Sequence, residues 1–124
     1  IDLHIEVPPV NFRELDAQTG GEPSKVIRER VVEARRLQSE RFRGAHSCNA
    51  RMNPKDLQKH CTMDKATRDL LRTAMEELAL SARAYDRILK VSRTIADLDG
   101  SQTLKTEHVS EAIQYRTLDR QIWT

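Results

Sequence analysis

The chain alternates between apolar and polar residues at its start and follows a helical period afterwards. Residues 1–10 read IDLHIEVPPV, in which every second residue is apolar until the two prolines. A period of two is typical of a β-strand with one buried face, and proline ends such a strand. We therefore predict a strand at residues 1–10 with His4 on its solvent face. Because a lone strand needs a sheet to join, we interpret it as the remnant of a sheet that the later residues do not supply.

A polar linker follows at residues 11–23, where the run DAQTGGEPS interrupts both periods. Its glycine pair does not make a phosphate-binding loop, because such a loop has a longer glycine-rich run followed by Lys and then Ser or Thr. We expect a hinge between the strand and the helices.

The rest of the chain contains about four or five segments with amphipathic helical patterns, joined by short loops. The first segment should end at about Phe42. Charges of both signs alternate along it, so we expect its arginines to form solvated ion pairs with neighbouring glutamates. Its inward side is predicted to consist of Ile27, Val31, Ala34 and Leu37.

Residues that favour N-cap positions mark the start of each helix. A short polar side chain at this position accepts a hydrogen bond from an N–H group of the first turn. Proline at the first helical position, as in Asn53-Pro54, strengthens the signal. The helix that begins after Asp64 should end near Leu80. The expected N-caps are Ser24, Asn53, Asp64, Ser81 and Thr106.

Together these patterns predict a mainly α fold, a helical bundle preceded by a remnant β-strand. With 124 residues, the chain is long enough for one domain with its own core. We divide it into the strand at residues 1–10, the linker at 11–23 and a helical domain at 24–124.

The most complete helical pattern runs from Ser81 to Gly100 and reads SARAYDRILKVSRTIADLDG. Gly100 suits the position just after the helix, where φ turns positive. Arg83 lies in the first turn, where a cation opposes the helix dipole and therefore indicates an anionic partner. The residues at helical spacing, all but the polar Ser92 and Asp99 predicted to be core-like, are Tyr85, Ile88, Leu89, Ser92, Ile95, Ala96 and Asp99.

Composition and charge make some functions less favoured without excluding them. Charged residues make up 32% of the chain and hydrophobic residues 38%, which is typical of a soluble helical protein. Aromatic residues make up only 4%, so stacking platforms for single-stranded nucleic acid are scarce. The net charge of +2 is too small to indicate DNA binding by itself. Without a signal sequence or a long apolar run, we expect a cytoplasmic protein with no membrane partner.

The two cysteines, Cys48 and Cys61, have His46 and His60 near them. A metal site with two Cys and two His ligands is therefore conceivable, but neither pair has the spacing of a zinc finger. We favour two reduced thiols and no metal site.

Four stretches of the sequence resemble one protein family. IDLHIEVPPV, CNARMN, LSARAYDRILKVSRTIADLDG and EHVSEAIQYR are similar to the C-terminal part of the magnesium-chelatase-like AAA+ ATPases, and within them to the bacterial ComM/YifB branch. The resemblance covers nearly the whole chain, and the segment Ser81–Gly100 carries its strongest part.

The resemblance implies that an α/β ATPase core outside these residues binds ATP and Mg, while residues 24–124 form a helical lid over the nucleotide. Because the chain begins with Ile1 rather than methionine, we expect a longer parent protein. The parent is expected to be an ATPase, and these residues alone are not. The implied partners are the N-terminal core of the same chain, neighbouring subunits of a hexameric ring, and DNA through the parent.

The resemblance also implies a nucleotide-binding residue. Lids of this kind carry an arginine called sensor 2 at the start of one helix, and Arg83 matches that position. A planar guanidinium with several donors is suited to phosphate oxygens. Arg87, one turn later, is a weaker candidate, and we expect Arg93 at the surface or at a subunit contact. Without the resemblance, Arg83 would be interpreted as a surface cation paired with Glu76, Glu77 or Asp86.

Three functions stay open at this point. The ComM-like branch is associated with helicase-like branch migration of DNA in competence. The alternative within the family is the motor-subunit lid of a magnesium chelatase. The third is a stand-alone helical domain that binds DNA or protein, for which the cations at 83, 87, 90 and 93 would form a basic helix.

Overall fold

The computed structural model describes residues 3–7, 21–43 and 48–123, and of residues 117–123 only the backbone. The described part is helical, which confirms the mainly α prediction. Its elements are α2 (Ser24–Phe42), the 3₁₀ turn η1 (Asn49–Arg51), α3 (Pro54–His60), α4 (Lys65–Glu77), α5 (Ala82–Leu98) and α6 (Thr106–Trp123). None of the described helices combines the length and apolarity needed to cross a membrane.

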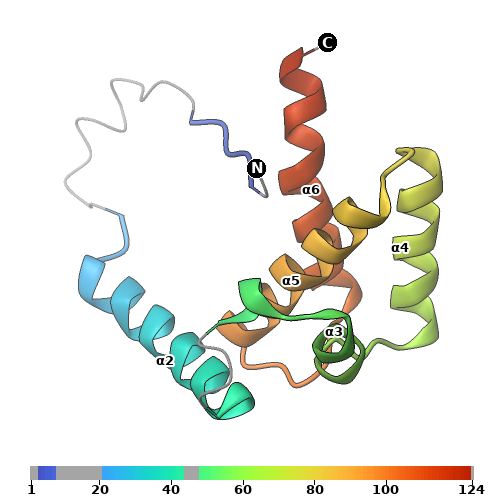
Figure 1. The fold of residues 1–124 in the computed structure, drawn as a ribbon. Coiled ribbons are helices and arrows are strands. Elements are labelled where there is room, and N and C mark those ends of the chain that lie inside the picture. The colour runs from blue at the N-terminus through green and yellow to red at the C-terminus, as the bar shows by residue number, and fades with distance from the viewer. Residues whose placement is uncertain (1–2, 8–20, 44–47, 124) are drawn as a thin grey trace, which may run out of the picture.

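Helix α5 is the centre of the bundle. It contacts α2, η1, α3 and α6, and α4 packs on α6. Figure 1 shows α2 and α4 at the two ends of the molecule with α5 and α6 between them. The helical core is made by Phe42, Met52, Leu57, Cys61, Leu71, Ile88, Leu89, Ala96, Leu104, Val109 and Ala112.

Three of the predicted N-caps are confirmed. The side chain of Asn53 accepts a hydrogen bond from the N–H of Asp56, whose carboxylate accepts one from the N–H of Asn53. The side chains of Asp64 and Ser81 each accept a hydrogen bond from the N–H three residues later. These caps fix where α3, α4 and α5 begin.

The predictions of Ser24 and Thr106 as N-caps are wrong by one residue. Pro23 precedes α2 and caps it without a side-chain hydrogen bond, so Ser24 is already helical. Likewise α6 begins at Thr106 itself. There the N–H groups of His108 and Val109 donate to the carbonyl of Lys105, and the Nδ1 atom of His108 accepts a hydrogen bond from the N–H of Lys105.

Gly100 ends α5 as predicted. Its φ is +71°, and the N–H of Ser101 donates to the carbonyl of Ala96, as in a Schellman motif. A second such motif ends α4, where the N–H of Leu80 donates to the carbonyl of Met75 and Ala79 adopts a φ of +50°. The helix therefore ends at Glu77, earlier than predicted, because the chain turns there to enter α5 directly.

The predicted inward side of α2 is only partly buried. Ala34 is 4% exposed, but Ile27 and Val31 are 42% and 46% exposed. The helix packs against α5 through its second half, where Gln38 and Phe42 are buried. The apolar periodicity is thus real, but the first half of the helix has no described element to cover it.

Residues 3–7 form no strand in the described part of the chain. Leu3, Ile5 and Val7 are exposed, while His4, predicted to face solvent, is half-buried. The N–H of His4 donates to the carbonyl of Tyr115 in α6. The physical reason is that no described segment offers a strand edge to these residues. Most of the predicted linker lies outside the described residues.

Candidate functional site

Arg83 projects from the first turn of α5. Its side chain is exposed, and among the described residues it has no hydrogen bond or ion pair, so the expected surface pair with Glu76, Glu77 or Asp86 is not formed. A cation at the positive end of a helix dipole has no intrinsic stabilisation there. The turn therefore presents an uncompensated guanidinium to solvent.

Arg87 is half-buried one turn later and takes part in a contact within the protein. The structure thus separates the two predicted site residues. Arg83 is the more accessible of the two, and the nucleotide-binding role of each stays a prediction.

A groove of about 880 Å³ runs beside this turn of α5. Tyr85 and Asp86 line it from α5, Arg68 from α4, and Lys55 and Gln58 from α3. The prediction of Tyr85 as core-like is wrong, because it is 37% exposed and faces this groove. Apolar side chains form the rest of the lining, with Leu57, Met63 and Leu89 among them.

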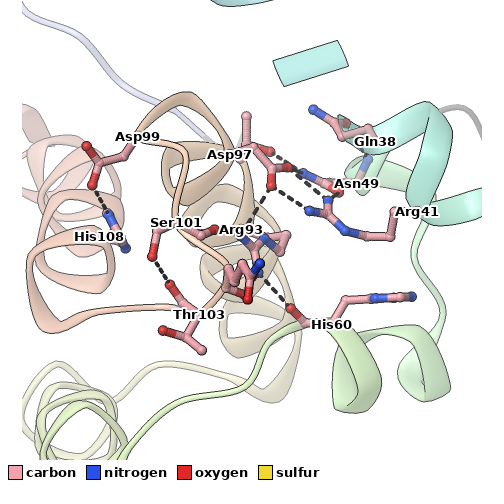
Figure 2. A network of polar contacts seen from close by, with 12 residues as sticks. Gln38, Arg41, Asn49, His60, Arg93, Asp97, Asp99, Ser101, Thr103 and His108 are labelled. Carbon is pink, nitrogen blue, oxygen red and sulfur yellow. Dashed lines mark hydrogen bonds and ion pairs between the residues drawn. The ribbon is translucent and has the colours of Figure 1, made fainter. Parts of the chain in front are cut away.

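The prediction of Arg93 as a surface charge is also wrong. Its side chain is 2% exposed, and that of Asp97, which follows one turn later, is 1% exposed. Arg41 of α2 donates to both carboxylate oxygens of Asp97, at 2.6 Å and 2.9 Å. Arg93 lies 3.2 Å from one of the same oxygens. Figure 2 shows the two guanidinium groups converging on this single carboxylate.

Asn49 completes the buried network from η1. Its amide Nδ2 donates to Asp97 at 2.9 Å and to Thr94 at 3.1 Å, while its Oδ1 accepts from Arg41 at 2.9 Å. The N–H of Asn49 donates to the side chain of Gln38 at 2.9 Å. Every polar group of this asparagine is therefore satisfied, as a buried amide requires.

Arg93 connects the network to the last residue of α3 and to the α5–α6 loop. Its guanidinium donates to the carbonyls of His60, Ser101 and Gln102, at 3.0 Å, 2.5 Å and 2.8 Å. Burial lowers the pKa of Arg93, and Asp97 opposes that shift. Through its two Nη atoms, Arg93 holds the end of α3 and the α5–α6 loop in place, while its buried Nε has no hydrogen-bond partner among the described residues.

A second polar cluster joins the end of α5 to the start of α6. Asp99, Glu107 and His108 place ligand-type atoms within 4.8 Å of one another. Because Nδ1 of His108 accepts from the N–H of Lys105, the ring proton lies on Nε2 and points to Asp99 at 2.9 Å. The hydrogen bond from His108 lowers the pKa of Asp99. A metal would have to displace that proton, so the cluster is explained as a lock between the two helices.

Cys61 does not resemble a metal ligand. Its thiol is buried, Sγ lies 3.8 Å from the carbonyl of Leu89, and burial raises the pKa to about 11. A metal binds the thiolate, which this environment disfavours. The ring of His60 packs edge-on against Phe42, and His46 of the conceivable quartet lies outside the described residues.

The buried network could have been suspected from the sequence. Leu89, Arg93 and Asp97 follow one another at four-residue intervals, so the two charges continue a line that begins in the core. A charged pair on the buried face of a helix indicates an internal ion pair. The second arginine that binds Asp97, Arg41, lies 56 residues away from it, so a local pattern does not reveal that contact.

Comparison with known proteins places the fold in a family. Residues 21–116 match the family described as magnesium chelatase, subunit ChlI C-terminal. The Competence protein ComM of Haemophilus influenzae is 44% identical over 121 residues, 96% of this chain and 23% of the relative. The YifB proteins of Salmonella typhimurium and Escherichia coli are 34% and 33% identical over 97% of this chain. The chain spans 23% of the length of each of these relatives.

Proposed function

The chain belongs to the magnesium chelatase ChlI C-terminal family, and on that basis we propose that it is the C-terminal lid of an AAA+ ATPase whose Arg83 senses nucleotide. In this proposal, ATP and Mg are bound mainly by an ATPase core outside these residues. The family match and the helical fold support the lid, and the exposed first turn of α5 supports the sensor.

The observation that carries the proposal is the lack of a partner for Arg83 within the described residues. An arginine near a helix N-terminus combines a guanidinium fork with a positive dipole, and both favour a phosphate. The same arginine has no stabilising role in the bundle itself. A ligand that brings negative charge to this turn would give it one.

The mechanism follows from the position of the arginine. With the lid closed over the core, Arg83 would donate to the γ-phosphate, and hydrolysis would remove that acceptor. Loss of the contact would change the preferred angle of the lid, which couples hydrolysis to motion. The parent would work as a cytoplasmic ring, which we propose to be a hexamer, in which each lid also meets a neighbouring subunit.

DNA is the proposed substrate of the parent. The 44% identity to the Competence protein ComM supports the ComM-like branch over a chelatase motor subunit. We therefore propose helicase-like branch migration in competence. The stand-alone DNA-binding domain is less favoured, because Arg93 is buried and does not contribute to a basic face of α5.

The test is ATP hydrolysis and nucleotide affinity of the full-length parent with Arg83→Ala. A hydrogen bond from a charged donor contributes about 1.5–3 kcal/mol, so turnover or affinity should fall by about tenfold to hundredfold. Arg35→Ala is the matched control, since Arg35 is an exposed arginine of α2. Unchanged turnover and affinity in a folded, assembled Arg83→Ala ring would refute the sensor role.

A further inference from the structure

An apolar groove opens between α2, α5 and the start of α6, far along α5 from Arg83. It has a volume of about 600 Å³. Its apolar lining consists of Ile27 and Val31 from α2 and Ile95 and Leu98 from α5. Ile27, Val31 and Leu98 are each more than 40% exposed. Large apolar side chains that gather at one exposed place mark an interaction surface.

The groove continues along α5 into a second, smaller cavity. This cavity of about 310 Å³ shares Ile95, Leu98 and Glu111 with the first. It adds Val91 and Lys90 from α5, and Leu3 and Ile5 line it from residues 3–7. Val91, Ile95 and Leu98 follow the helical spacing of four and three residues, so they form a stripe of about two turns, or roughly 10 Å. This length suits a short helix laid along the stripe.

The rim of the groove on the α6 side is acidic. Asp99, Glu107 and Glu111 line it, and all three are exposed. The one cation of the 600 Å³ lining is Arg30, whose charge is already paired with Glu22 at 2.7 Å. Asp99 accepts a hydrogen bond from His108, whereas Glu107 and Glu111 form no ion pair with another described residue. The groove thus combines an apolar floor with a negative edge.

We propose that this groove binds a basic amphipathic helix from a separate partner protein, with apolar residues in the floor and Lys or Arg against the acidic rim. Charge complementarity favours this occupant. A symmetric contact between two copies of this chain would place the acidic rim against itself, which costs free energy. The proposal does not depend on the role of Arg83, because no residue of that turn lines the groove.

The test uses the full-length parent and a synthetic helix of about 18 residues, with Leu at i, i+3, i+4 and i+7 and Lys at the flanks. Binding is measured by fluorescence anisotropy, and a peptide with Glu in place of Lys is the control. The double variant Glu107→Lys/Glu111→Lys should weaken binding by about tenfold or more, because it reverses the rim charge. The matched control is Glu76→Lys/Glu77→Lys, two exposed acids of α4.

Further measurements keep the outcome decisive. Raising NaCl from about 50 mM to 500 mM should weaken binding several-fold, since exposed charges are screened. If the double reversal unfolds the protein, the milder Glu111→Gln should still weaken binding in the same direction. The proposal is overturned if the Lys peptide does not bind at about 100 µM, if the Glu peptide binds equally well, or if the α4 control loses as much affinity.

Evidence for either of two other occupants of the groove would also overturn the proposal of a basic partner helix. A dimer in light scattering that Glu107→Lys/Glu111→Lys dissociates would assign the groove to a second copy. Slow alkylation of a cysteine placed by Leu98→Cys in the folded parent, with no peptide added and no dimer present, would assign it to another part of the same chain.

Discussion

Replacing Asp97 by Asn tests whether the buried network holds the bundle together by charge. The substitution keeps the shape of the side chain and removes its negative charge. Two guanidinium groups, those of Arg41 and Arg93, would then lose their shared counterion. Removing one partner of a buried ion pair costs about 3–5 kcal/mol, because it leaves a charge uncompensated.

The lower part of that range is expected here. The side chain of Arg41 is 15% exposed, so water can solvate part of its charge, whereas that of Arg93 is 2% exposed. We therefore predict a loss of about 3 kcal/mol in the free energy of unfolding. For a domain whose total stability is about 5–15 kcal/mol, this is a large fraction.

Urea denaturation measured by far-UV circular dichroism checks this value. With a slope of about 1–3 kcal/mol per molar urea, the midpoint should fall by about 1–3 M. The matched control is Asp69→Asn, which removes the carboxylate of an exposed pair with Arg72. Exposed pairs contribute about 0–1 kcal/mol, so its midpoint should scarcely move. A loss below about 1 kcal/mol in Asp97→Asn would refute the reasoning.

A second substitution, added to Asp97→Asn, tests whether the lost stability comes from the charge of Asp97 or from its packing. Adding Arg41→Met to Asp97→Asn removes one of the two stranded cations, so it should recover part of the lost stability. If instead the two losses simply add, Asp97 acts through its packing and individual hydrogen bonds, and the charge argument is wrong.

Two further predictions concern Cys61 and Ala79. The raised pKa of Cys61, about 11, means that the unfolded chain releases its proton first. Stability should therefore decline as the pH rises from about 9 to 11, by up to about 2 kcal/mol more than in Cys61→Ala, and equal slopes in pH-dependent urea titrations would contradict this. Ala79→Gly should raise stability by about 0.5–1 kcal/mol in thermal and urea unfolding, because Gly adopts the φ of +50° without strain. Ala66→Gly, at an exposed position within α4, should instead lower it by a similar amount, and a loss in Ala79→Gly would show that its turn is not strained.

Local signals predicted where the helices are, because their caps are local interactions. The side chains of Asp64 and Ser81 each bond to an N–H three residues away, and Gly100 turns the chain with its own φ. Ser24 and Thr106 failed as caps because each helix begins one residue earlier than expected, and its first-turn N–H groups donate to the carbonyl of Pro23 or of Lys105. Such a shift depends on atomic positions that a residue pattern does not contain.

Tertiary contacts, which the residue patterns do not contain, determine which of these side chains are buried. Ile27 and Val31 have the correct period for burial, but burial also needs a second surface, and α5 reaches only the later half of α2. Arg93 was placed at the surface because most arginines are solvated. Its burial is tolerable because the carboxylate of Asp97 and backbone carbonyls from the end of α3 and the α5–α6 loop surround its guanidinium. Arg83 was identified through the resemblance, and its role stays a prediction.

The two ends of α5 differ in how their charged side chains are bonded. Its second half is fixed by Asp97 and Arg93, which bond to groups from α2, η1, the end of α3 and the α5–α6 loop. Its first turn presents Arg83, ten residues before Arg93 and so about 15 Å away along the axis. Because packed cores resist gradual deformation, a force on Arg83 would move the whole bundle rather than deform it locally. In the proposed lid, the buried network would therefore be what turns one lost phosphate contact into movement of the domain as a rigid body.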